Sequence, residues 1–354
     1  MTAVIDWDLA ERVAARFSGR EPFAASYHYD ALGPDFAELT AIAEDRVATT
    51  TGLVSAAGLA RARVVDRPAW IAANLASFQR LLRPLTDKLG ERMGAGPLAP
   101  VAQKVAGAEV GALLGWMSTR VLGQYDLLVV EDEDLENQDI VYYVGPNVLA
   151  LEKRFAFPPR EFRLWLALHE VTHRAQFTGI PWLRTHYLGL VDEVVGGVDP
   201  DPKRFIAAIG RVADDLREGR NPLDDGGLAA VLATPDQRLA LDRVAGLMSL
   251  LEGHGDVTMD RAGADQIPSA ERFGRVLRQR RQQTNGLARL LQRLMGLEAK
   301  LAQYELGERF IEAIEAVGGP TALDAVWEDP ARLPTLAEIR DPAGWLARID
   351  LAVA

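Results

Sequence analysis

Apolar side chains recur at helical spacing through most of the chain. Residues 35–53 and 67–89 both place apolar side chains three and four positions apart, which puts them on one helical face. Two segments break this period, residues 124–130 and 139–151, and both are rich in β-branched and aromatic side chains. The pattern therefore predicts a mainly α protein with a small β-sheet (α+β), in which these two segments are strands.

The most lipid-like stretch, residues 106–123, is predicted to be a helix of a soluble core. An acidic and a basic side chain interrupt it, and its uncharged interior is too short to span a bilayer. Gly107, Gly111 and Gly115 recur every four residues and line one helical face. Because a face without side chains lets another helix approach closely, we expect tight helix packing here.

Composition and charge narrow the classes of function. The 354 residues include 39 basic and 50 acidic side chains, and the resulting net charge of −11 would repel nucleic acids and anionic membranes. We therefore expect neither as a partner. No cysteine is present, so histidines and carboxylates must supply the ligands of any transition metal. Asp6, Asp8 and Glu11 stand where a secretory signal would be basic and then apolar, which favours an early helix and a cytoplasmic protein.

A helix is predicted to follow the second strand segment. Pro158 and Pro159 suit its start, because proline fixes φ and needs no donor there. Gly179 and Pro181 are expected to end it. This predicted helix carries the sequence His-Glu-Val-Thr-His at residues 169–173, which is the HExxH pattern.

The HExxH pattern predicts a zinc site on this helix. His169 and His173 are four residues apart, so both imidazoles lie on one face and can reach the same ion. Glu170 lies beside them, where it can activate a metal-bound water. A hydrolytic zinc needs a third protein ligand, and the metzincin solution is absent because residues 176 and 179 are Gln and Gly.

Glu252 is our first candidate for the third ligand. It interrupts an apolar helical run, and burying a carboxylate there is costly unless the group is paired or binds metal. Asp256 follows one turn later and is expected to accept a proton from an imidazole N–H, which would fix the tautomer of that ligand. Two alternatives stay open: His254, which falls on the opposite helix face, and Glu193, whose following turn has Gly where an Asp would be expected.

The chain resembles zincin-type metallopeptidases, and more narrowly an actinobacterial family of uncharacterised hydrolases, some of them associated with deazaflavin coenzyme biosynthesis. The resemblance lies in residues 115–129, 142–152, 168–184 and 249–260 and in the C-terminal third. It implies a zincin-like core embedded in extra helices. We therefore expect an N-terminal helical region over residues 1–100 and a catalytic region with C-terminal helices over 101–354, or one continuous domain.

These observations predict a zinc-dependent hydrolase acting on a peptide or protein substrate. Glu170 would take a proton from the metal-bound water that attacks the peptide bond and hand it to the leaving amine. The alternative is a zinc-stabilised scaffold or accessory binding protein without turnover.

Overall fold

The computed structural model describes residues 4–21, 23, 25–93, 99–127, 139–196, 235–282 and 297–349. The chain divides into two compact units. Unit 1 comprises Met1–Gly179 with Thr258–Phe273, and unit 2 comprises Ile180–Val257 with Gly274–Ala354. Residues on both sides of position 100 belong to unit 1, and the division expected there stays a prediction.

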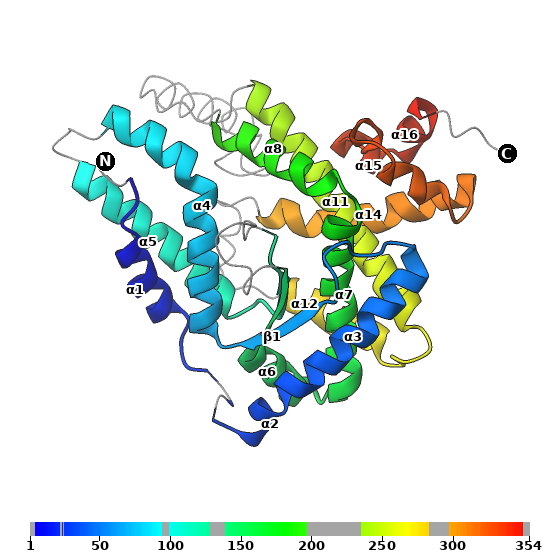
Figure 1. The fold of residues 1–354 in the computed structure, drawn as a ribbon, viewed down its shortest axis with the longest axis horizontal. Helices are drawn as coiled ribbons and strands as arrows, with labels where there is room; N and C mark the ends of the chain where they lie inside the picture. Colours follow the sequence, from blue (N-terminus) through cyan, green and yellow to red (C-terminus); the bar gives the residue numbers. More distant parts are fainter. Residues whose placement is uncertain are drawn as a thin grey trace. The chain divides into compact units, whose positions relative to one another are not determined.

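Unit 1 holds a three-stranded sheet and most of the helices of the first half of the chain (Figure 1). Its elements are α1 (Trp7–Phe17), α2 (Tyr27–Asp30), α3 (Leu32–Thr51), β1 (Arg61–Val65), α4 (Arg67–Met93), α5 (Ala99–Ser118), β2 (Gly123–Tyr125), β3 (Ile140–Val144), α6 (Gly145–Phe155) and α7 (Pro159–Gly179). The mainly α fold with a small sheet, and the helix predicted to begin after Pro158, are both confirmed.

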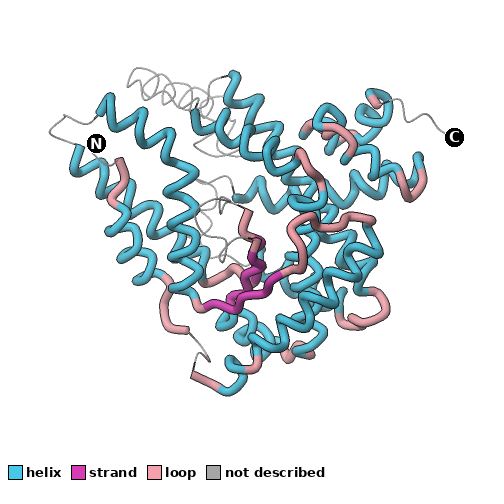
Figure 2. Tube along the Cα trace, in the orientation of Figure 1, coloured by secondary structure: helices cyan, strands magenta, loops and turns pink. Residues whose placement is uncertain are grey.

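The sheet, magenta in Figure 2, has the order β1-β3-β2. β1 runs parallel to β3, and β2 runs antiparallel to it with Gly123 opposite Tyr143. All residues of β3 are buried, and successive side chains point to opposite faces. Ile140, Tyr142 and Val144 join a core with α1, α4 and α5. On the other face Tyr143 stacks on Phe36 of α3, which packs against α7.

The strand prediction was correct in part. β3 lies in the predicted segment 139–151, but this segment turns into α6 at Gly145, so residues 145–151 were assigned wrongly. Pro146 stands in the first turn of α6, where a missing N–H costs nothing. β2 overlaps the other predicted strand, 124–130, at residues 124 and 125 only. Residues 126 and 127 are not in a strand, and residues 128–130 lie outside the described residues. β1 was not predicted.

The glycine face of α5 packs directly against α1. A Cβ added at Gly107, Gly111 or Gly115 would lie 2.3–2.5 Å from a backbone oxygen of the segment Asp6–Ala14. The close helix packing expected from the spacing of these glycines is therefore confirmed, and the two helices run side by side in Figure 1. In the described part of the chain, no helix is long and apolar enough to cross a membrane.

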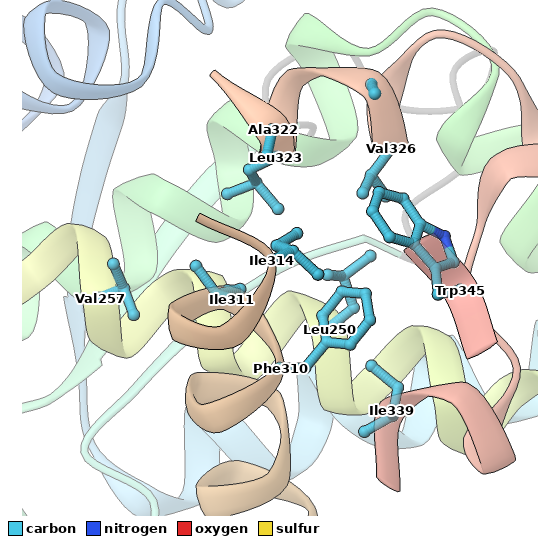
Figure 3. Close-up of a cluster of buried hydrophobic side chains, with 11 residues drawn as sticks. Leu250, Val257, Phe310, Ile311, Ile314, Ala322, Leu323, Val326, Ile339 and Trp345 are labelled. Atoms are coloured by element: carbon cyan, nitrogen blue, oxygen red, sulfur yellow. The ribbon is translucent and has the colours of Figure 1, made fainter. Parts of the chain in front are cut away.

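Unit 2 is helical and has its own apolar core. Its elements are α8 (Leu183–Gly196), α14 (Leu297–Gly318), the 3-10 helices η1 (Ala322–Trp327) and η2 (Pro330–Arg332), α15 (Leu336–Arg340) and α16 (Pro342–Arg348). Two further helices, α11 (Pro235–Gly263) and α12 (Ala270–Gln282), belong partly to each unit. Leu250 of α11, Phe310 and Ile314 of α14 and Trp345 of α16 meet in the core of unit 2 (Figure 3).

α11 and α14 cross with their backbones in contact. A Cβ at Gly307 would lie 1.8 Å from the carbonyl oxygen of Ser249, and a Cβ at Gly253 would lie 2.3 Å from the carbonyl carbon of Gly307. No side chain fits between the two helices at this point. The crossing therefore fixes α11 at the residue next to Glu252.

Candidate metal centre

The two histidines of the HExxH pattern face each other on α7. Their Nε2 atoms are 3.2 Å apart, and the rings are nearly perpendicular with centroids 4.6 Å apart. Both side chains are half-buried. The arrangement follows from the helix, because residues four apart lie one above the other on the same face.

The donor set of this pair suits a zinc ion. Two nitrogens bound to one tetrahedral zinc at about 2.05 Å each are about 3.3 Å apart, close to the separation of the Nε2 atoms. The Nδ1 atom of His173 lies 3.0 Å from Oε1 of Gln176, which is fully buried. If Nδ1–H donates to this amide oxygen, the lone pair of the imidazole is at Nε2, on the side facing His169.

Buried ion pairs anchor α7 on both sides of the histidines. Arg174, 1% exposed, forms salt bridges of 2.6 Å with Asp139, which precedes β3, and with Glu44 of α3. Arg163, also buried, donates from Nε and Nη2 to the two carboxylate oxygens of Glu152 at 2.8 and 2.9 Å. A buried guanidinium is tolerated when such partners satisfy it. These contacts hold the motif helix against α3, α6 and the start of β3.

Glu170 is buried against the sheet. Its side chain is 7% exposed and lies next to β2, where a Cβ on Gly123 would come within 2.6 Å of its Cγ and Oε1 atoms. The neighbouring Tyr143 has its hydroxyl 2.8 Å from Oγ1 of Thr40. Burial raises the pKa of Tyr143 and outweighs the opposing hydrogen bond with Thr40, and the nearby charge of Glu170 raises it further. Tyr143 is therefore neutral and already partnered.

Glu252 lies in the part of α11 that belongs to unit 2. It is 8% exposed, and Leu247, Leu250 and Leu251 around it are buried. Among the described residues, His169, His173 and Glu252 form the group of His, Asp and Glu side chains that could hold one metal ion. A buried carboxylate in an apolar run is consistent with this role, because its desolvation needs a compensating cation or hydrogen-bond donors.

The alternative ligands have other surroundings. His254 is buried at 3% exposure, with its ring centroid 5.4 Å from that of Trp327. Glu193 is half exposed and forms a 2.6 Å salt bridge with Arg243. Asp256 follows Glu252 by one helical turn and is partly buried, and its role beside the ligands stays a prediction.

Two residues of this centre were not assigned a role from the sequence. Gln176 was visible on the histidine face of the helix, and its spacing of three from His173 was the signal. Gly123 gave no signal, because it has no side chain and its contact with Glu170 depends on the sheet.

Comparison with known proteins agrees with this geometry. A family model described as a zincin-like metallopeptidase matches residues 5–346. A crystal structure of a "putative hydrolase with a novel fold" from Chloroflexus aurantiacus superposes with a TM-score of 0.70 and 31% sequence identity, covering 98% of this chain and 99% of that one. No curated protein matches the chain.

Proposed function

Because the chain belongs to the zincin-like metallopeptidase family, we propose that it is a zinc-dependent hydrolase that cleaves peptide bonds, with His169, His173 and Glu252 as the metal ligands. The sequence-based resemblance to zincin-like metallopeptidases is confirmed by the family match. The association with deazaflavin coenzyme biosynthesis stays a prediction.

The geometry of the His pair carries this proposal. Two Nε2 atoms 3.2 Å apart, one of them on an imidazole held through Nδ1 by Gln176, form a ready pair of metal ligands. The buried carboxylate of Glu170 follows the first ligand directly in the chain.

Glu252 is proposed as the third ligand on three grounds. It is a buried carboxylate in an apolar run, it belongs to the group of residues that could hold an ion, and α11 continues as one helix into unit 1. In unit 1, Nη1 of Arg46 donates to the carbonyl oxygen of Ala262 near the end of α11 at 2.7 Å. Asp256 is proposed to accept a hydrogen bond from an imidazole N–H of the ligands.

In the proposed hydrolysis, different residues of this chain have different roles. Zinc, when bound, supplies a Lewis acid that polarises a carbonyl oxygen and lowers the pKa of water. Glu170 takes a proton from the attacking water and delivers it to the nitrogen of the leaving amine. Burial of Glu170 keeps bulk water away from this proton, and Gln176 keeps the His173 imidazole in the tautomer that presents Nε2.

The substrate strand is proposed to pair with β2. β3 has a partner on each side and therefore offers no edge for an extended peptide. In the described part of the sheet, β2 pairs on one side only, and its Gly123 lies against Glu170. Addition of a strand there would bring a peptide backbone next to the proton acceptor.

Replacing Glu170 by Gln tests the proposal. We expect the Glu170→Gln variant to keep about one zinc per chain, because its metal ligands are intact. Hydrolysis of fluorescein-labelled casein should fall by about 100-fold or more, the usual contribution of a general base. If the zinc-loaded wild type releases no peptides, the hydrolase proposal is wrong and the scaffold alternative stands. Equal release by the wild type and the variant would overturn the proposed role of Glu170.

A further inference from the structure

We propose that Gly123 is a positioning residue for Glu170: the absence of a side chain in β2 determines where the carboxylate of Glu170 lies. The contact is a property of unit 1 alone. Its consequence for catalysis rests on the function proposed above, in which Glu170 moves the proton.

Residue 123 is glycine because there is no room for a side chain next to Glu170. A Cβ on Gly123 would lie 2.6 Å from Cγ, 2.6 Å from Oε1 and 2.8 Å from Cδ of Glu170. Non-bonded carbon atoms favour separations of about 3.5–4.0 Å, so a methyl group and the present Glu170 conformer exclude each other. Gly123 is not among the glycines with positive φ, so backbone conformation gives no other reason for glycine here.

The strand cannot move away to make room. Gly123 lies opposite Tyr143 and shares its face of the sheet, the face toward α3 and α7. On the other face Gln124 accepts a 2.7 Å hydrogen bond from the indole N–H of Trp70 and exchanges hydrogen bonds with Asn74. Just before the strand, the carbonyl of Leu122 accepts from the backbone N–H of Val144 at 2.9 Å.

The helix is equally fixed. Arg174, whose guanidinium is buried, joins α7 to Asp139 and Glu44 through salt bridges four residues beyond Glu170. Tyr125 of β2 stacks on Phe177 of α7, with ring centroids 6.5 Å apart. Because β2 and α7 are both fixed, a Cβ added at residue 123 must displace the side chain of Glu170. A side chain at residue 123 therefore turns the carboxylate away and leaves the imidazoles of His169 and His173 in place.

A double-mutant cycle in stability tests the contact without any substrate. We compare wild type, Gly123→Ala, Glu170→Ala and the double variant by thermal unfolding, all without metal. Gly123→Ala should lower the melting temperature by roughly 5 °C in the wild-type background, which is the scale of an overpacked contact in a domain of this size. It should lower it by less than about 1 °C when residue 170 is Ala, because the atoms that collide are gone.

Gly33→Ala is the matched control. Gly33 lies in α3, and a Cβ there meets nothing within 4 Å. This variant should leave the melting temperature unchanged or slightly higher, since alanine favours a helix. Equal losses from Gly123→Ala in both backgrounds would overturn the proposal. If Gly123→Ala does not fold, folding of the double variant supports the proposal, and failure of both overturns it.

The catalytic consequence is measured separately. Gly123→Ala should keep about one zinc per chain, lower kcat on labelled casein about 100-fold and change KM less than about threefold. If Gly123→Ala only reduced the amount of folded protein, zinc content and kcat would fall together. If Glu170→Gln leaves hydrolysis intact, the proposed role of Glu170 is wrong, but the stability cycle still tests the contact between Gly123 and Glu170. Full kcat in a zinc-loaded Gly123→Ala would overturn the positioning role.

Discussion

The two helices that carry the proposed ligands differ in what fixes their side chains. On α7, His169, His173 and Gln176 are placed by the period of the helix itself, and a buried arginine ties the helix to its neighbours. On α11, the place of Glu252 depends on another helix, because α14 touches its backbone at Gly253. The comparison teaches that a spacing motif can specify two ligands, whereas the third depends on tertiary packing.

The packing of the two helices also differs in chemistry. α7 buries an apolar face and is also anchored by polar contacts, in which Arg163 and Arg174 reach carboxylates of other elements. α11 is fixed in unit 2 by an apolar cluster that includes Leu250 and Phe310 (Figure 3) and by direct backbone contact. Changes at the α11–α14 crossing should therefore act through volume, and changes at the two arginines of α7 through lost hydrogen-bond partners.

The largest effect is expected from Glu252→Ala. Loss of a ligand should weaken zinc binding by more than about 100-fold, beyond the range for residues that only support ligands. Competition with a chromogenic chelator measures this affinity, and the metal content of the purified variant should fall well below one per chain. The rise in melting temperature that zinc gives the wild type should disappear with it.

Glu193→Ala is the control for this prediction. Glu193 lies on α8 in an exposed salt bridge with Arg243, and such pairs add about 0–1 kcal/mol to stability. Its removal should leave zinc affinity within about twofold of wild type. If Glu193→Ala lowers zinc affinity more than Glu252→Ala does, Glu193 is the ligand. The third ligand then lies on α8, and the comparison of α7 with α11 does not apply to the metal site.

A smaller effect is expected from Gly307→Ala, which tests the helix crossing beside Glu252. The added methyl group would lie 1.8 Å from the carbonyl oxygen of Ser249, so α14 must shift. We expect the free energy of unfolding to fall by about 2 kcal/mol, overpacking being offset in part by the helix propensity of alanine. Denaturant unfolding of the metal-free protein measures this.

Gly189→Ala provides the comparison for that crossing. Gly189 is an exposed helical residue of α8, and a Cβ there meets nothing within 4 Å. The same substitution should leave stability unchanged or raise it by up to about 1 kcal/mol. Equal unfolding free energies for the two variants would mean that α11 and α14 can separate without cost.

The sequence predicts those features that a local period determines. The helix of HExxH, the glycine face of α5 and the apolar run around Glu252 all repeat at helical spacing. Residues 145–151 were misassigned because a short apolar run suits a buried strand and a buried helix alike. β1 was missed because Arg61 and Arg63 occupy alternate positions in a strand of five residues, which weakens its apolar pattern.

The residues of the candidate site were likewise predictable only where a local pattern in the sequence indicates them. His169, Glu170 and His173 follow from one motif, and Glu252 follows from the cost of a carboxylate among leucines. Gly123 could not be found, because its contact with Glu170 joins residues 47 positions apart (170 − 123) and exists only once β2 pairs with β3.

The smallest effect is expected from Gln176, which lies one turn beyond His173 on α7. Gln176→Ala removes the acceptor 3.0 Å from Nδ1 of His173, so the imidazole is free to change tautomer and to turn. Zinc affinity should fall by about 10-fold, the lower end of the usual cost of losing such a partner. Gln176→Glu keeps an oxygen acceptor and should retain affinity better than the alanine variant. Wild-type affinity in Gln176→Ala would show that the helix alone orients the ligand, which would sharpen the contrast with α11.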